Sequence, residues 1–226
     1  MRFQELLYAW YADLYRYEGS TSIGIFVKHW LLSPGYTFTF YLRLCQYLAK
    51  KRPRIVVFPL YALTAEACDP TLPGFPLYAL ARILLRHYSY KFGMFIPYDT
   101  PIGLGFYIGH CGDIHFNARA QVGKNCNISQ GVTLGQANRG NNEGYPTIGN
   151  GVYIGPGAKI VGAVRVGNNV AIGANCVVTK DVPDNAVVVG IPGRVISSDG
   201  AAGYVEFTDY KPYTGPVRQP VVETKS

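Results

Sequence analysis

The chain has 226 residues, enough to bury a full hydrophobic core, and we expect one main domain with an attachment. Hydrophobic residues make up 48% of it and charged residues 15%, which excludes an intrinsically disordered protein. The net charge of +7 would suit nucleic acid, a phosphate-bearing cofactor or a membrane surface. Because no Lys/Arg-rich run with interleaved aromatic residues occurs, we expect no nucleic-acid partner.

The N-terminal part, residues 1–95, is predicted to be a helical region rich in aromatic and basic residues. Residues 1–35 are expected to be helical up to Gly19, and Pro34-Gly35 marks a turn. Residues 36–52 carry apolar side chains at helical spacing and end in the basic cluster KKR, as a helix C-terminus prefers. Acidic residues interrupt the first predicted helix, so no signal peptide is expected and a cytoplasmic location is the default.

The sequence FPLYAL occurs twice, at 58–63 and at 75–80. Each copy lies in an apolar run of about eleven residues, which is too short to cross a bilayer as a helix. Basic residues flank both runs, and tyrosines are frequent nearby. Two interpretations stay open: a helical subdomain packed on the rest of the protein or on a sister subunit, and an interfacial segment on the inner face of an anionic membrane.

A six-residue repeat organises residues 148–183. Cut into sixes, the stretch reads IGNGVY, IGPGAK, IVGAVR, VGNNVA, IGANCV and VTKDVP, and each piece begins with Ile or Val. The fifth position is small and apolar in every piece. This period fits neither an α-helix nor a single strand. It indicates a parallel β-helix, in which the inward aliphatic side chains of successive coils stack.

The predicted β-helix domain covers residues 96–196, since the repeat begins irregularly at Ile102 and ends near GIPGRVI. At about 18 residues per three-sided coil it has about four to five coils. Extra residues between Leu134 and Ile148 form the polar loop QANRGNNEGYP, and such loops often carry function. The polar tail, residues 197–226, is predicted to be disordered or draped on the surface.

The five cysteines show no metal-type CxxC spacing. Cys126 and Cys176 fall at the small inward position of the repeat, so we expect them to be buried and reduced.

Several of these segments are recognisable together. IGHCGDIHFN, NISQGVTLGQ, the repeats at 148–183 and GIPGR resemble the hexapeptide-repeat acyltransferases, and within them the serine acetyltransferase group. The resemblance covers residues 102–196. It implies a mainly β fold, a left-handed parallel β-helix with an N-terminal α-helical region, and assembly as a homotrimer. It also implies acetyl transfer from acetyl-CoA to a hydroxyl, in a cleft between neighbouring subunits.

His110 matches the family's catalytic histidine, and we expect it to act as general base. A hydroxyl is a poor nucleophile at neutral pH, so a base must take its proton as it attacks the thioester, and histidine suits this task. The developing oxyanion needs positioned N–H donors. Because the attack can be direct, none of the cysteines need be a nucleophile. The orienting carboxylate for His110 is assigned to Asp113, with Asp99 as an alternative.

The acceptor residues depart from those of the serine enzymes. The family's orienting carboxylate would fall at Phe95, and the Asp before its histidine at Gly109. The Arg-His pair that holds the amino acid's carboxylate falls at Gly144 and Tyr145. Without that charged clamp we expect a sugar hydroxyl as acceptor, in capsule, exopolysaccharide or lipopolysaccharide synthesis, and L-serine as the alternative. A lipid-linked sugar would also explain the apolar, basic N-terminal region.

The resemblance also places the pantetheine arm of acetyl-CoA along one edge of the coils. Small residues there would let the backbone approach the ligand. Basic side chains nearby are candidates for the CoA phosphates. The assigned cofactor-binding residues are Gln136, Gly155, Pro156, Gly173 and Ala174 for the arm, and Lys180 and Arg194 for the phosphates.

Two further classes remain as alternatives. His110 and His115 are five residues apart, as are two zinc ligands in carbonic anhydrases built on the same β-helix. Such a site needs a third histidine from a neighbouring subunit, whereas the remaining histidines, His29 and His87, lie outside the repeat. We therefore expect no metal. The other alternative is a scaffold that uses the β-helix only to trimerise.

Overall fold

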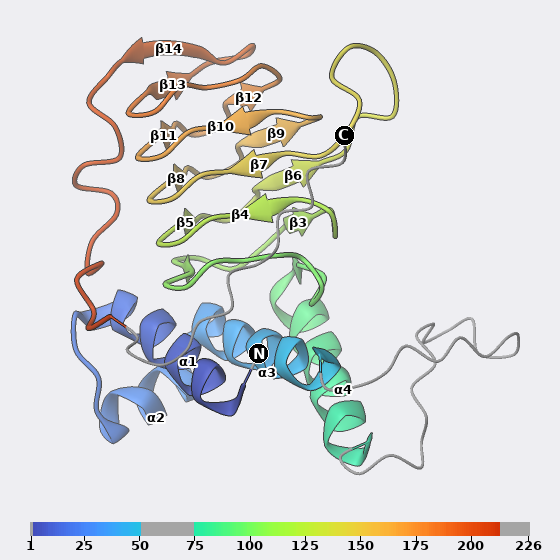
Figure 1. Cartoon of the computed structure of the whole chain (residues 1–226), viewed down its shortest axis with the longest axis vertical. Helices are drawn as coiled ribbons and strands as arrows, with labels where there is room; N and C mark the ends of the chain where they lie inside the picture. Colours follow the sequence, from blue (N-terminus) through green and yellow to red (C-terminus); the bar gives the residue numbers. More distant parts are fainter. Residues whose placement is uncertain (1, 51–74, 213–226) are drawn as a thin grey trace, which may run out of the picture.

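The computed structural model describes residues 2–50 and 75–212. Four helices gather at one end of the molecule, and short strands stack above them into a three-sided prism (Figure 1). The chain climbs coil by coil from the helices to β14 at the far end, and a final segment returns along the side of the prism. The described part thus runs from a helical region through a stack of coils to a tail.

The helices are α1 (Phe3–Glu18), α2 (Ile23–Leu32), α3 (Pro34–Lys50) and α4 (Phe75–Phe92). Helix α1 ends at Gly19, as predicted. Gly19 adopts the left-handed conformation with φ 65° and donates its N–H to the carbonyl of Tyr15 at 2.8 Å, a common way to end a helix.

Two local predictions for this region need correction. Residues 23–32 form a separate helix, and α3 begins at Pro34 itself, because proline is well tolerated in the first turn of a helix. The second FPLYAL copy begins α4. The first copy, at 58–63, lies outside the described residues, as do Lys51 and Arg52 of the basic cluster.

The strands form three sheets, which we call A (order β1-β3-β6-β9-β12), B (β10-β7-β4) and C (β14-β13-β11-β8-β5-β2). All neighbours are parallel except β13 and β14, which are antiparallel. The strands are β1 Met94–Phe95, β2 Tyr107–Ile108, β3 Ile114–Phe116, β4 Gln121–Val122, β5 Asn127–Ile128, β6 Thr133–Gly135, β7 Thr147–Ile148, β8 Tyr153–Ile154, β9 Lys159–Val161, β10 Arg165–Val166, β11 Ala171–Ile172, β12 Val177–Val178, β13 Val187–Val189 and β14 Arg194–Ser197.

The core of the prism confirms the six-residue pattern, and the fold is the predicted left-handed parallel β-helix. Both the first and the fifth residue of each repeat point inward, and each is no more than 6% exposed. Register pairs keep identical or similar side chains stacked, as in the row Ile108, Ile128, Ile154, Ile172 and Val188 of sheet C. Such a stack buries apolar area in every coil.

A buried ion pair joins the helices to the first coil. Arg43 on α3 donates from Nε and Nη2 to the two carboxylate oxygens of Asp13 on α1, at 2.9 and 3.2 Å. Arg43 also donates to the carbonyls of Ile102 and Gly103, at 2.8 and 2.6 Å, and Asp13 accepts the N–H of Phe106 at 2.9 Å. Asp13 is 1% exposed and Arg43 4%, so both charges are fully paired inside the protein.

The described part of the tail, residues 198–212, lies along the edge between sheets B and C (Figure 1). The ring of Tyr204 stacks on Tyr153 at 4.5 Å, and the hydroxyl of Tyr210 donates to Asn125 at 2.9 Å. At its end the tail reaches α1, where Arg16 donates to the carbonyl of Glu206 at 2.7 Å. Residues 198–212 are therefore draped on the surface, and the rest of the predicted tail lies outside the described residues.

Replacing Arg43 by Met should destabilise the protein strongly. The change leaves the carboxylate of Asp13 buried without its counter-ion, which typically costs roughly 3–5 kcal/mol. We expect a clear fall in the free energy of unfolding measured by urea denaturation. Lys28→Ala is the matched control, because Lys28 forms an exposed ion pair with Glu18 and such pairs contribute little. An Arg43 variant as stable as this control would contradict the role given to the buried pair.

Candidate active site

His110 lies in the turn between β2 and β3, where the chain passes from sheet C to sheet A, and its side chain is exposed. The equivalent turns of the higher coils stack above it. The N–H of Gly131 donates to the carbonyl of Gly112 at 2.8 Å, and the N–H of Gly157 to that of Gln130 at 2.9 Å. We call this line of turns, residues 109–113, 129–132, 155–158, 173–176 and 190–193, the His110 edge.

The helical region sets the position of β2 and therefore of His110. The hydroxyl of Tyr17 on α1 donates to the carbonyl of Ile108 at 3.2 Å, and the rings of Tyr17 and Tyr107 lie 4.6 Å apart. Burial raises the pKa of the Tyr17 hydroxyl well above its ordinary value, so it stays a neutral donor. A Cβ on Gly35 would lie 2.2 Å from the carbonyl oxygen of Ile108, so only glycine lets α3 pack here.

The assigned carboxylate, Asp113, points to a second histidine. Its Oδ1 lies 3.1 Å from Nε2 of His115, and its Oδ2 lies 4.0 Å from Nζ of Lys159. His115 in turn stacks on Phe95, with ring centroids 4.8 Å apart. These contacts of His115 with Asp113 and Phe95 were not predicted from the sequence, because they depend on which residues become neighbours in adjacent coils. Asp113 as the partner of His110 stays a prediction, as does its alternative Asp99, which is exposed after β1.

The cofactor residues divide between two edges. Gly155, Pro156, Gly173 and Ala174 follow β8 and β11 and so share the His110 edge. Gln136 and Lys180 instead follow β6 and β12, on the edge between sheets A and B, and Arg194 begins β14 at the end of the prism. The structure therefore brings four of the seven residues onto one line with His110.

The two glycines of this line also have a structural reason to be glycine. A Cβ on Gly155 would lie 2.8 Å from the carbonyl oxygen of Ile172, and one on Gly173 would lie 2.9 Å from Cγ1 of Val189. Coil stacking alone therefore excludes side chains at both positions. Their small size is compatible with a ligand but is not specific to one.

Gln130 is a further candidate for the site that was not predicted from the sequence. It lies on the His110 edge one coil above Cys111 and Gly112, and its side-chain Oε1 is buried without a hydrogen-bond partner among the described residues. An unpaired buried amide oxygen is costly unless a ligand or a water pairs with it. It is thus suited to accept an N–H of a bound molecule, such as an amide of pantetheine. Nothing in the sequence distinguishes this glutamine from a surface one.

The cysteines behave as expected where they are buried. Burial raises the pKa of the Cys126 thiol to about 11 and that of Cys45 to about 12, and also raises that of Cys176. These thiols therefore stay protonated near neutral pH and are poor nucleophiles. Cys111, beside His110, is exposed.

The polar loop between β6 and β7 folds back on the prism. Ala137 and Gly144 exchange backbone hydrogen bonds at 3.1 and 3.0 Å, and the side chain of Asn142 donates to the carbonyl of Thr179. At the base of the loop, Nη1 of Arg119 donates to the hydroxyl of Tyr145 at 2.9 Å. The positions that would carry the family's carboxylate clamp, Gly144 and Tyr145, therefore have an exposed arginine beside them.

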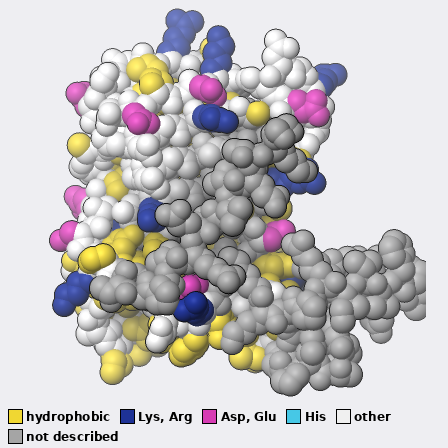
Figure 2. Space-filling view, in the orientation of Figure 1, with side chains coloured by type: hydrophobic (Ala, Val, Ile, Leu, Met, Phe, Trp, Pro, Cys, Tyr) yellow, Lys and Arg dark blue, Asp and Glu magenta, His cyan; other side chains and the backbone are white. Residues whose placement is uncertain are grey.

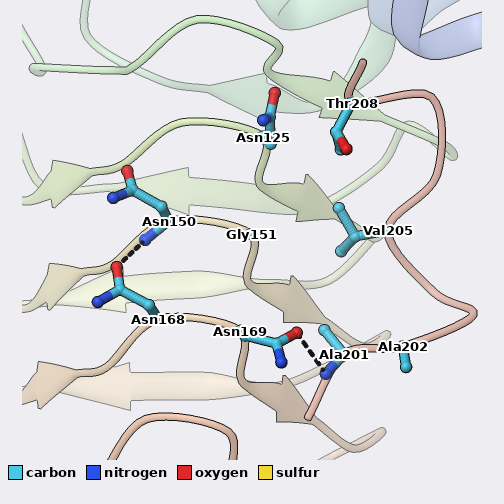
Figure 3. Close-up of a pocket in the computed structure, with 9 residues that line it drawn as sticks. All are labelled: Asn125, Asn150, Gly151, Asn168, Asn169, Ala201, Ala202, Val205 and Thr208. Carbon is cyan, nitrogen blue, oxygen red and sulfur yellow. Dashed lines mark hydrogen bonds between the residues drawn. The ribbon is translucent and has the colours of Figure 1, made fainter.

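A cavity of about 320 Å³ lies between the tail and the edge that joins sheets B and C (Figure 3). The amides of Asn150 and Asn168 line it, but they are engaged in a ladder between coils, in which Asn168 accepts the N–H of Asn150 at 2.9 Å. Asn169 is likewise bonded to the tail, at Ala201. The cavity is on a different edge from His110, so it is not part of the candidate active site.

Within residues 2–50 and 75–212, no group of three or more His, Cys, Asp or Glu side chains is arranged to hold a metal ion.

Comparisons with known proteins agree with this geometry. Residues 145–180 match the family model "Bacterial transferase hexapeptide (six repeats)". Serine acetyltransferase from Bacillus pumilus is 40% identical over 141 residues, which are 62% of this chain and 65% of the relative. Serine acetyltransferase from Synechococcus elongatus is 43% identical over 118 residues, which are 52% of this chain and 48% of the relative. The chain thus spans less than two thirds of these relatives' lengths.

Solved structures extend the likeness to most of the chain. Serine acetyltransferase from Brucella abortus superposes with a TM-score of 0.66 and 28% identity, over 88% of this chain and 71% of that one. The Neisseria gonorrhoeae enzyme, solved in complex with serine, superposes with a TM-score of 0.62 and 27% identity. The match covers 86% of this chain and 70% of that one.

These relatives contradict the prediction of a sugar acceptor in polysaccharide synthesis. The curated and solved proteins named above are serine acetyltransferases, which agrees with the alternative acceptor instead. Residues aligned with the clamp do not decide the acceptor by themselves, because alignment cannot show which side chains lie beside those positions in space. The chain carries the repeat of the bacterial hexapeptide transferases on a left-handed β-helix, and serine acetyltransferases are its relatives.

Proposed function

We propose that this protein is an acetyl-CoA-dependent O-acetyltransferase whose acceptor is L-serine. The observation that carries the proposal is the position of His110, exposed in the turn after β2 on a fold shared with serine acetyltransferases over 88% of the chain. One solved relative from Brucella abortus is in complex with coenzyme A.

In this proposal His110 takes the proton of the serine hydroxyl as the oxygen attacks the thioester carbonyl. The new C–O bond gives a tetrahedral oxyanion, which collapses as the C–S bond breaks, and the proton taken by His110 passes to the leaving sulfur, so that coenzyme A leaves as the thiol. Direct attack needs no cysteine nucleophile, in keeping with the raised pKa values of the buried thiols. Backbone N–H groups of the His110 edge are candidates to stabilise the oxyanion.

Acetyl-CoA is the acetyl donor in this scheme, and residues of the His110 edge suit its pantetheine arm. Of the four assigned residues on this edge, Gly155 is buried, Pro156 and Gly173 are half-buried and Ala174 is exposed, so the arm would lie against the last three. The unpaired Oε1 of Gln130 is a suitable acceptor for an amide N–H of the arm. We assign the more distant Gln136, Lys180 and Arg194 to the cofactor only on the ground of the family resemblance.

We also propose a homotrimer, with each site between neighbouring subunits, and a cytoplasmic location. The resemblance is the ground for both. Light scattering should then give three times the 24.9 kDa of one chain.

Arg119 is our candidate to hold the carboxylate of L-serine. The clamp positions of the family carry Gly144 and Tyr145 here, which leaves the acceptor's negative charge without an aligned partner. The guanidinium of Arg119 is exposed and is held against the Tyr145 hydroxyl, so a cation is available at the same place. Because this place is on the edge between sheets A and B, Arg119 would serve the His110 of a neighbouring subunit in the proposed trimer. An arginine can bind a carboxylate through two parallel hydrogen bonds.

His110→Ala should abolish turnover while leaving the fold intact. Loss of a general base lowers kcat by about 10² to 10⁴-fold, which release of the CoA thiol from acetyl-CoA and L-serine would measure. His87→Ala is the matched control, since His87 is exposed on α4 outside the site and its loss should not change the rate. Residual activity within tenfold of wild type, about 1.4 kcal/mol, would show that His110 is not the base.

Arg119→Leu should raise the KM for L-serine by about tenfold or more, because a charge-assisted pair to the carboxylate is lost. The KM for L-serinamide, which lacks the carboxylate, should stay as in wild type. Arg165→Leu, which removes an exposed arginine on sheet B, is the control. If wild type releases no CoA with either amino acid, the acceptor is wrong. If only the role of Arg119 is wrong, wild type and variant will use L-serine equally well.

A further inference from the structure

Helix α2 presents an apolar stripe to solvent. Ile23, Val27 and Leu31 follow one another at four-residue spacing, and they are 85%, 43% and 63% exposed. Leu32 beside them is 75% exposed. Side chains at this spacing share one face of a helix, so the stripe is continuous rather than scattered.

Helix α4 presents a second stripe. Leu77, Leu80 and Ile83 are 51%, 52% and 64% exposed. Residues on the opposite face, among them Tyr78 and Leu85, are buried against the rest of the molecule. Among the described residues, α4 is thus packed along one side, and the free side of its first half is apolar.

Both stripes lie at the helical end of the molecule, away from β14 (Figure 1). Hydrophobic side chains gather along the lower margin of the space-filling view, over the helices, whereas the β-helix surface above is mostly polar (Figure 2). Exposed apolar groups concentrated at one end of a protein indicate an interaction surface. We call the exposed residues of the two stripes, Ile23, Val27, Leu31, Leu32, Leu77, Leu80 and Ile83, the apolar end.

The charged side chains on α2, α3 and α4 are all cationic, and Glu18 at the end of α1, which lies beside α2, is paired there with Lys28 and His29. The sequences of α2, α3 and α4 contain no aspartate or glutamate, and no acidic residue occurs between Glu18 and Glu66 or between Asp69 and Asp99. Exposed cations do occur on these helices, with Arg86 and Lys91 on α4. Tyr90, 63% exposed, lies between them in the sequence. Apolar, cationic and aromatic side chains without acidic ones are typical of helices that bind anionic lipid.

We propose that the apolar end docks the protein onto an anionic lipid bilayer. The aliphatic side chains enter the interface, and the neighbouring cations meet the lipid phosphates. The contact is peripheral, because no helix among the described residues is long and apolar enough to cross a membrane. Held in this way, the prism and His110 extend from the membrane surface. The proposal does not depend on the identity of the acceptor.

A second copy of the chain fits this surface less well. A two-fold interface apposes the same patch of both subunits. Arg86 and Lys91 of each would then face a surface on which α2, α3 and α4 offer no acidic partner. Like charges brought together in this way oppose association, whereas anionic lipid compensates them.

The test is sedimentation of the full chain with vesicles. We expect binding to vesicles of phosphatidylglycerol and phosphatidylcholine, and little binding to phosphatidylcholine alone. Ile83→Glu should weaken binding by at least about tenfold, because it puts an anion at the bilayer surface. Ile196→Glu is the matched control, since Ile196 on β14 is 63% exposed at the far end of the prism and its variant should bind like wild type. Arg86→Glu should weaken binding by at least about fivefold.

Three outcomes would overturn the proposal. The first is no sedimentation with phosphatidylglycerol vesicles at low salt. The second is equal loss of binding in the Ile83 and Ile196 variants, which would mean that general charge and not the apolar end drives it. The third is a lower oligomer mass for Ile83→Glu by light scattering without any vesicle binding by wild type, which would make the surface an interface between copies. Circular dichroism melting checks that each variant is folded.

Discussion

The buried pair of Asp13 and Arg43 is the interaction on which the arrangement of this protein depends. A β-helix needs its open first coil covered, and here the helices cover it. Besides binding each other, both side chains bind the backbone. Arg43 donates to the carbonyls of Ile102 and Gly103, and Asp13 accepts the N–H of Phe106. Those backbone groups lie directly before β2, so the same contacts fix the strand that carries His110. The desolvation of two charges is tolerable only because each is fully paired.

Above that junction, geometry is set by repetition. Each coil repeats the backbone of the coil below, so a residue type suited to one turn recurs in the next, as with the stacked Ile row of sheet C. Repetition also explains why glycines alone do not identify the ligand-binding residues. At Gly155 and Gly173 a side chain would collide with the neighbouring coil whether or not a ligand binds. Groups that coil stacking does not account for, such as the unpaired Oε1 of Gln130, are therefore the more informative ones.

In our proposal for the acceptor, a charge is supplied from a different place in the sequence. The loop position that carries a histidine in the family pattern has Tyr145, and its hydroxyl is bonded to Arg119 from the preceding coil. A carboxylate does not require a particular residue number, only a cation at the right point in space. The relatives, all serine acetyltransferases among those compared, and this local substitution agree with one another, whereas the missing clamp taken alone argued for a neutral sugar.

The sequence by itself determined the β-helix, because a six-residue period of inward aliphatic side chains is a local pattern that admits few other folds. It also determined the end of α1 at Gly19. The tertiary structure alone decided that Asp113 contacts His115, that Gln130 has an unpaired oxygen, that Arg119 reaches Tyr145 and that residues 198–212 return to α1. Each of these depends on which side chains meet across coils or between distant segments. A sequence pattern determines the period of the coils. It does not determine these contacts between side chains, because they depend on loop paths and side-chain packing.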